Sequence, residues 1–393
     1  MTSSPYIKPY LQTPGPTPIP PEVSQEMAYP VVYHRAPAFV PIYEKALKSL
    51  QTIFDTQNQV LCFAASGTGG MDSAFANLVR PGDKVLVTSA GKFGERWRDL
   101  AEAYQADFVY LDVEWGTQIE PDAVDKALTE NPGIEIVFTT FSETSTGVVH
   151  DVKAIAEVAH KHDALVVVDA ISGIGAGELH QDDWNLDVVV SGSQKALMLP
   201  PGMGFASANP AALERAAARP EGRFFFDWLK ADKGQKKDPP DSPFTPPVNL
   251  MMALGKATDM ILEEGMDNVW ERHRLLGRAA RAAAKAHGWE IFGLDAEEAA
   301  VVTAISVPDG IDGNKVTKTM RDKYGITIAG GQSQLKGKIV RIAHCGYFGP
   351  FDIVTVVSAL ELTFNELGGS FELGAGVGAA LEVFANAGVT VGA

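Results

Sequence analysis

Residues 187–203, DVVVSGSQKALMLPPGM, are the stretch from which the fold of this chain can be deduced. Three valines at 188–190 have the composition of a buried strand, and small polar residues separate them from Lys195. Two prolines and a glycine then turn the chain at 200–202. The pattern predicts a strand that ends in a bend and presents a single amine there.

Upstream of this stretch, short apolar runs alternate with amphipathic helical stretches. Helices are predicted at 69–79, 94–105, 121–130 and 151–162, and strands at 60–65, 84–90, 107–113, 134–140, 164–170 and 187–192. Near-continuous Val and Ile strands in such an alternation indicate the α/β class, a mostly parallel sheet with helices on both faces. Ligands of such sheets bind beyond the carboxyl ends of the strands. Functional residues are therefore expected directly after each run.

The composition divides the chain into three parts. Residues 1–21 hold seven prolines, which exclude a helix or a central strand and predict an extended arm. Residues 22–264 form the predicted large domain. Residues 265–393 form a smaller α+β domain, with helices at 267–287, 312–324 and 351–367 and strands at 300–307, 326–329 and 338–343. Its Ala- and Gly-rich end, 372–393, is compatible with a packed or a loose tail.

The composition also excludes several classes of protein. Of the 393 residues, 46% are hydrophobic and 21% are charged, as in a soluble globular protein. The formal net charge of -16 argues against nucleic-acid and anionic-membrane partners. There are only two cysteines, no signal-peptide pattern and no apolar run long enough to span a bilayer. We therefore expect a cytoplasmic protein without a disulfide framework.

Three segments after the predicted strands have a composition that suits ligand binding. SGTGG at 66–70 opens a helix, and the start of a helix binds anions such as phosphate, although a simple tight turn has the same sequence. Phe93, on a predicted short loop, could stack on a planar heterocycle; taken alone, a core position is the commoner role. The hydroxyl groups of SETSTG at 142–147 could bond a phenolate or phosphate, or could simply line a polar loop.

Two charged residues complete the set. Asp169 closes an apolar strand, and a carboxylate buried there needs a partner, which a pyridinium N–H, an arginine or backbone amides could supply. Lys195 follows the last apolar run. Together the five features supply an anion cradle, a stacking ring, a carboxylate and an amine, which are the groups that pyridoxal 5′-phosphate requires. We predict that Lys195 holds this cofactor as a Schiff base, and we predict no metal.

The chain resembles fold-type I pyridoxal phosphate enzymes of the class V aminotransferase family, in the alanine–glyoxylate and serine–glyoxylate branch. The resemblance extends over nearly the whole chain. It rests on TPGPTPIPPEV, SGTGG, GKFGER, SETSTGV, VVVDAIS, SGSQKALMLPPG, PFTPPV and GKIVRIAHCG. SGSQK followed by PPG is the most specific of these motifs.

The resemblance implies roles for individual residues around the cofactor. Lys195 would carry it and shuttle a proton, and Asp169 would pair with the pyridinium nitrogen. Phe93 would stack on the ring, and Thr144 would lie near the ring and its O3′. The remaining implied contacts are with the phosphate and would come from Thr68, Gly69, Gly70, Gln194 and, reaching into the neighbouring subunit of a homodimer, Thr245.

The resemblance also implies a substrate pocket. Arg341 would hold the substrate carboxylate through a bidentate guanidinium, although on sequence alone it is equally a surface charge on a strand. Gly15 of the arm would line the pocket. Three departures from relatives bear on substrate range: Phe93 replaces a frequent Trp, Gly70 replaces a His, and Ser242 stands where some relatives have an aromatic.

The implied activity is transamination of a small amino acid, alanine or serine, with glyoxylate or another small 2-oxo acid. Aspartate and ureidoglycine remain alternative donors. A lyase or desulfurase is the second possibility, but those enzymes usually place His before the cofactor lysine, where this chain has Gln194, and Cys345 has the setting of a small buried residue. A third possibility, a non-catalytic or NAD-binding protein, is disfavoured because SGTGG does not match G-x-G-x-x-G.

Overall fold

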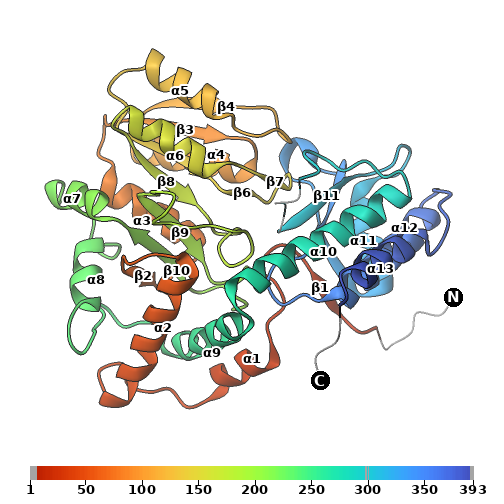
Figure 1. Cartoon of the computed structure of the whole chain (residues 1–393), viewed down its shortest axis with the longest axis horizontal. Helices are drawn as coiled ribbons and strands as arrows, with labels where there is room; N and C mark the ends of the chain where they lie inside the picture. Colours follow the sequence, from red (N-terminus) through yellow and green to blue (C-terminus); the bar gives the residue numbers. More distant parts are fainter. Residues whose placement is uncertain (1–6, 297–298, 300, 390–393) are drawn as a thin grey trace.

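The computed structural model describes residues 7–296, 299 and 301–389. Its largest element is a seven-stranded sheet, which lies in the left half of Figure 1. The strands follow the order β2 (Val60–Phe63), β10 (Gly204–Ala208), β9 (Val188–Gly192), β8 (Leu165–Asp169), β5 (Ile136–Thr140), β3 (Lys84–Ser89) and β4 (Asp107–Asp112). Strand β10 is antiparallel to both of its neighbours, and the other pairs are parallel. The predicted α/β class is confirmed.

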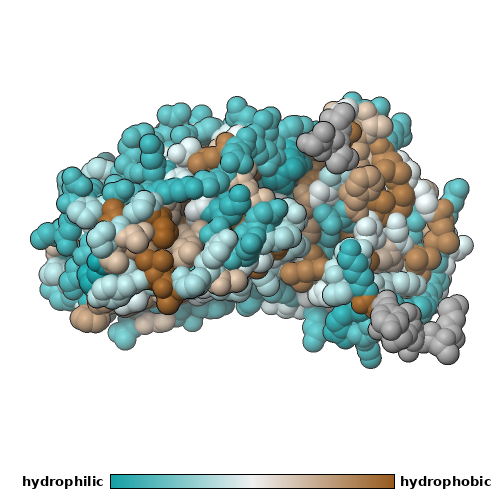
Figure 2. Space-filling view, turned by 90° about the horizontal axis from the view of Figure 1, so that it is seen from below, coloured by the Kyte–Doolittle hydropathy of each residue, from teal (hydrophilic) through white to brown (hydrophobic). Residues whose placement is uncertain are grey.

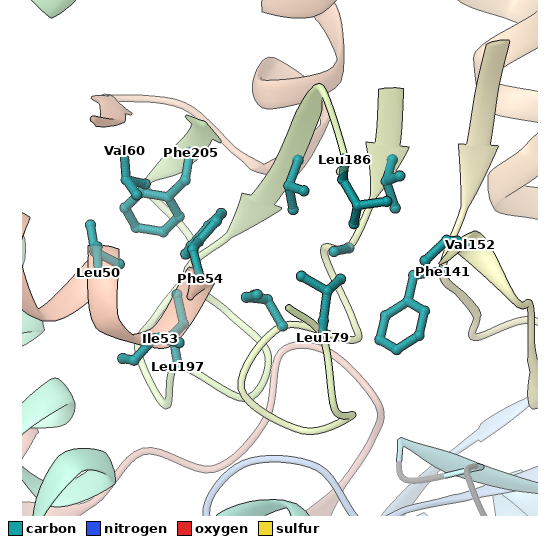
Figure 3. Packing of buried hydrophobic residues seen from close by; sticks show 14 of the residues in the cluster. Leu50, Ile53, Phe54, Val60, Phe141, Val152, Leu179, Leu186, Leu197 and Phe205 are labelled. Atoms are coloured by element: carbon teal, nitrogen blue, oxygen red, sulfur yellow. The ribbon is translucent and has the colours of Figure 1, made fainter. Parts of the chain in front are cut away.

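Both faces of this sheet are buried, as its continuous apolar strands predict. In β8, Val166 and Val168 belong to one hydrophobic core and Val167 belongs to the other. The first core contains residues of α2 (Val40–Phe54), α5 (Pro121–Glu130), α6 (Val152–Lys161) and α9 (Val248–Glu264). Figure 3 shows part of it, with Leu50 and Phe54 of α2 beside Val60 and Phe205. The second core lies under α3 (Gly67–Leu78), α4 (Lys92–Ala103), α7 (Pro210–Ala218) and α8 (Trp228–Gln235).

A second, four-stranded sheet lies in the right half of Figure 1. Its order is β1 (Tyr10–Gln12), β12 (Ile326–Gly330), β13 (Ile339–Ala343) and β11 (Val302–Ser306). It packs with α10 (Met266–Ala286), α11 (Gly313–Tyr324), α12 (Pro350–Glu366) and α13 (Ala375–Asn386) around a third core. The division of the chain into domains at residues 21 and 264 stays a prediction.

The proline-rich arm forms an edge strand of the second sheet. Strand β1 pairs in parallel with β12, and Tyr10 is the partner of Ile326. An edge position agrees with the prediction that prolines exclude a central strand. The arm continues into α1 (Pro21–Ala28), which packs on α9. Between β1 and α1 it contacts Lys195, which follows the carboxyl end of β9.

The C-terminal segment is packed rather than loose over its described part. Glu361 of α12 accepts hydrogen bonds from the backbone of Gly374 at 2.7 Å and of Gly376 at 2.9 Å, at the start of α13. His287 also contacts Glu361, at 2.8 Å. Residues 390–393 of the predicted tail lie outside the described residues.

The surface in Figure 2 is mainly hydrophilic, and hydrophobic residues gather at the right-hand end, over the C-terminal helices. Leu362, Leu373 and Leu381 are among the exposed apolar residues of this region. Among the described residues, none of the helices has both the length and the apolar character needed to cross a lipid bilayer.

Candidate active site

Lys195 lies in the bend that follows β9. Ser193 holds this bend, because its hydroxyl donates to the Pro200 carbonyl at 2.7 Å and its backbone N–H donates to Met203 at 3.0 Å. The Lys195 side chain is buried, and burial lowers the pKa of its amine from the ordinary value. Its Nζ donates to the Pro14 carbonyl at 2.7 Å. The sequence prediction of a single amine in a bend is therefore correct, and the amine is shielded from solvent.

The arm covers this amine. The Thr17 hydroxyl donates to the Lys195 carbonyl at 2.9 Å, and the Thr17 N–H donates to Gln194 at 3.2 Å. Gly15 lies directly against the lysine, because a Cβ built on it would fall 2.3 Å from Lys195 Nζ. Any larger side chain at this position would have to displace the Lys195 side chain. The structure thus places Gly15 beside the amine, and its role in lining a substrate pocket stays a prediction.

Asp169, at the end of β8, is buried close to Lys195. One carboxylate oxygen accepts a hydrogen bond from the Ile171 N–H at 2.8 Å. Burial raises the pKa of Asp169 to about 7, and the nearby cations Arg96 and Lys195 act in the opposite direction. Such a carboxylate is held ionised by any additional cationic donor placed beside it.

Phe93 lies in the first turn of α4, and the predicted loop position is wrong. The helix begins at Lys92, two residues earlier than the predicted 94, because its first turn is capped from outside the helix. Lys195 Nζ lies 5.8 Å from the centre of the Phe93 ring, and the Arg96 guanidinium lies 5.0 Å from it. A planar ring attached near the amine would therefore find an aromatic face within stacking distance.

The SGTGG segment forms the start of α3 next to the end of β9. A Cβ on Gly192 would fall 2.9 Å from both the Gly67 N and Gln194 Oε1, so the helix start, the strand end and the glutamine side chain meet. Gly69 and Gly70 already donate to the Ser66 carbonyl. The first-turn amides without an intrahelical partner are then those of Gly67 and Thr68.

Gly70 is buried against the sheet, where a Cβ would lie 2.8 Å from the Phe205 carbonyl oxygen. The backbone therefore leaves no room for the His of some relatives. Gln194 Oε1 is buried, and the described part of the chain offers it no hydrogen-bond partner. The phosphate contacts of Thr68, Gly69, Gly70 and Gln194 stay predictions that this geometry permits.

Arg341 of β13 and Thr144 are brought together. The buried Arg341 donates through Nη1 to the Thr144 carbonyl at 2.7 Å, and through Nε and Nη2 to Gly330 at 3.0 and 2.8 Å. The surface alternative for Arg341 is therefore wrong. Burial lowers the pKa of its guanidinium to about 10. The described residues accept three of its five N–H groups, which leaves two for a carboxylate.

Two other residues considered in the sequence analysis, Thr245 and Cys345, do not form hydrogen bonds with Lys195 or Asp169 in the described part of the chain. Thr245 is exposed, and the ring of its neighbour Phe244 stacks on Phe225 at a centroid distance of 5.4 Å. The contact of Thr245 with a second subunit stays a prediction. Cys345 is buried, and burial raises the pKa of its thiol to about 11. A thiol in this state is a poor nucleophile.

The described residues contain no group of three or more His, Cys, Asp or Glu placed to hold a metal ion.

Sequence reasoning missed two charged residues of the site. Glu143 was quoted within SETSTG without a role, yet it is completely buried and hydrogen-bonded to the start of α4. Arg96 lies one helical turn after Phe93 and contacts the ring. The signal for Glu143 was available, because an acidic residue directly after an apolar strand needs partners, as Asp169 does.

These groups fit pyridoxal phosphate. Glycine at position 15 and at position 192 lets the backbone approach the Lys195 side chain and the start of α3 closely. A buried carboxylate with a raised pKa suits a pyridinium N–H, and Phe93 suits the face of a pyridine ring. Lys195, Asp169, Phe93 and the start of α3 would hold the cofactor, and Arg341 would lie at the substrate side.

Comparisons with known proteins show the family and the fold to which the chain is similar. The sequence model of the aminotransferase class-V family matches residues 9–344. L-aspartate–glyoxylate aminotransferase of Paracoccus denitrificans is 35% identical to the chain, over 94% of each protein. Serine–glyoxylate aminotransferase of Methylorubrum extorquens is 34% identical, also over 94% of each. The crystal structure of ureidoglycine–glyoxylate aminotransferase from Bacillus subtilis superimposes with a TM-score of 0.90 at 32% identity, over 98% of this chain and 100% of that chain.

Proposed function

The chain belongs to the class-V aminotransferase family, and from this premise we propose that it transfers the amino group of a small amino acid to glyoxylate or another small 2-oxo acid. The observation that carries the proposal is that the buried Lys195 amine lies near both the Phe93 ring and the carboxylate of Asp169. Pyridoxal phosphate, when bound, supplies an electron sink that stabilises negative charge at the substrate Cα.

The residues of the chain supply the remaining steps. Because burial lowers the pKa of Lys195, a larger fraction of its amine is neutral at neutral pH than for an exposed lysine, and the neutral amine can accept a proton from the substrate Cα and return it in the opposite half-reaction. Arg341 binds the α-carboxylate that the amino acid and the oxo acid share. The arm excludes water over the amine. One pocket therefore serves both halves of a ping-pong cycle.

Glyoxylate is the acceptor that we place first, because the three relatives described above are all named for it. Their named donors differ: aspartate, serine and ureidoglycine. We propose alanine or serine as the donor of this chain, with aspartate and ureidoglycine as alternatives. A desulfurase function has less support because the described Cys345 thiol is buried and follows the Arg341 strand.

A panel of single half-reactions tests this function. Amino acids are added one at a time to the cofactor-loaded protein, and the visible absorbance of the lysine-bound cofactor is followed. We expect alanine or serine to abolish this absorbance fastest, and glyoxylate to restore it. A protein whose absorbance responds to no amino acid would contradict the proposal, and release of alanine and sulfide from cysteine would favour a desulfurase.

We also propose that the enzyme works as a homodimer in the cytoplasm. Large apolar side chains are exposed on the single chain: Phe224 is 74% exposed, and Val31 and Tyr33 are 69% and 65% exposed. Thr245 is exposed near Phe224, which contacts Phe244 at 5.6 Å. Burying these residues against a second copy would remove apolar surface from water. Sedimentation should give the mass of two chains, and a fully active monomer would contradict the proposal.

A further inference from the structure

Glu143 is a buried carboxylate that accepts four hydrogen bonds. One oxygen accepts from the backbone N–H groups of Phe93 and Gly94, both at 3.0 Å. The other accepts from the N–H of Ser145 at 3.1 Å and from its hydroxyl at 2.6 Å. Burial raises the pKa of Glu143, and these hydrogen bonds oppose that effect. Since every partner donates and a protonated carboxyl would itself have to donate, the arrangement fits the ionised form.

The first contact of Glu143 sets the position of the stacking ring. The N-cap residue of helix α4 is Gly91, which has no side chain to cap the helix. Glu143 and Ser145 supply the cap from a segment about fifty residues away, because the Ser145 hydroxyl also accepts from the Lys92 N–H at 3.0 Å. A Cβ on Gly91 would lie 2.4 Å from the Glu143 carboxyl carbon. The first turn of α4, with Phe93 in it, is therefore docked on this carboxylate.

Glu143 also acts on Arg341, the residue that we propose binds the substrate carboxylate. Thr144, the next residue, holds the Arg341 guanidinium through its carbonyl and donates its hydroxyl to Ser172 at 2.6 Å. The negative charge of Glu143 counteracts the effect of burial on the pKa of Arg341. The backbone of Glu143 pairs with Val148 in the β6 (Ser142–Glu143) and β7 (Val148–Val149) hairpin, which anchors the segment.

We propose that ionised Glu143 is a positioning residue that fixes the Phe93 ring against the cofactor and, as a counter-charge, weakens the grip of Arg341 on substrate carboxylates. The inference rests on the proposed function. In the free enzyme Glu143 would balance the buried guanidinium. In the complex it would limit how tightly the α-carboxylate binds, so that the oxo-acid product can leave. Glu143 has no contact with substrate in this role and acts through Phe93 and Arg341.

The test is Glu143→Gln, with two ligands measured separately. The glutamine amide nitrogen cannot accept a hydrogen bond, so the two hydrogen bonds to one of the Glu143 oxygens are lost. The negative charge disappears as well. We expect pyridoxal phosphate to bind the apoprotein about tenfold more weakly in tryptophan-fluorescence titrations. Glycolate, which carries the carboxylate of glyoxylate without its carbonyl, should bind roughly threefold to tenfold more tightly by calorimetry. Amide exchange at Phe93 and Gly94 should be faster in the apoprotein.

Two further variants separate charge from geometry. Glu143→Asp keeps the charge but shortens the reach, so cofactor binding should weaken while glycolate affinity stays at the wild-type value. Gly91→Ala places a methyl group against the intact carboxylate, so it should also weaken cofactor binding and leave glycolate affinity unchanged. This variant provides the test if Glu143→Gln does not fold. Equal weakening of both ligands, or no change in either, in Glu143→Gln would overturn the role of Glu143. Wild-type protein that binds no pyridoxal phosphate would instead overturn the proposed function.

Discussion

Replacement of Lys195 by alanine is expected to lower the rate of amino transfer by about 10²–10⁴-fold, the contribution typical of a positioned acid–base group. The Lys195 amine is buried, with a pKa lowered by burial, and it lies 5.8 Å from the Phe93 ring. In the part of the chain that the structure describes, no second lysine contacts that ring. The visible absorbance of the lysine-bound cofactor should disappear as well. Both quantities are measured with pyridoxal phosphate added in excess.

The control for this variant is Lys161→Ala, at the exposed end of α6. It removes the same ammonium from a solvated position and should change neither the rate nor the absorbance. Added methylamine should restore part of the rate of Lys195→Ala, because a small free base can occupy the space that the side chain leaves. Full activity of Lys195→Ala would show that another group moves the proton.

The sequence predicted the large sheet because its strands carry a strong and repeated signal. A run such as the three valines of β8 is buried on both faces of the sheet, and it can be recognised as a strand without knowing which strands pair with it. Strand β10, with the sequence GFASA, was not predicted because it has small and polar residues. It is stabilised by pairing with β2 and β9, which are distant in sequence, and local composition does not encode that pairing.

The positions of the candidate-site residues could be predicted where the local sequence determines them, and they were missed where two segments distant in sequence determine them together. Lys195 and Asp169 each follow an apolar strand, and that local pattern is visible in the sequence. The start of α4 was placed too late because its cap comes from Glu143 and no local capping residue marks it. Arg341 had two possible roles, and its burial, which only the tertiary structure reveals, excludes the surface role, while carboxylate binding stays a prediction.

Replacement of Asp169 by asparagine is expected to stabilise the apoprotein above neutral pH while impairing catalysis. Burial raises the Asp169 pKa from its ordinary value of 3.8 to about 7. Between these values the folded state binds more protons than the unfolded state, so the stability of the wild-type apoprotein falls as the pH rises. The cost is absent below pH 3.8 and complete above about pH 7. Three pKa units correspond to about 4 kcal/mol, which is the upper limit for the gain in Asp169→Asn.

The asparagine can still accept the hydrogen bond from the Ile171 N–H, so the comparison isolates the charge. Unfolding of both apoproteins in urea at a series of pH values measures the difference, which should be near zero at pH 4 and reach its maximum above pH 7. The matched control is Asp187→Asn, a buried carboxylate directly before β9 that contacts His160 at 2.8 Å and accepts from the Val166 backbone and from Asn209, each at 2.7 Å. That variant loses charge-assisted hydrogen bonds and should be less stable than wild type.

The same substitution should lower the amino-transfer rate at every pH, because a neutral amide cannot hold a pyridinium nitrogen in its protonated form. A gain in apoprotein stability together with a loss of activity is expected when a buried charged group destabilises the folded protein but is needed for the reaction. If Asp169→Asn destabilises the apoprotein at pH 8 as Asp187→Asn does, Asp169 is a structural carboxylate whose hydrogen bonds outweigh the cost of burial. Its assignment to the cofactor ring would then be wrong.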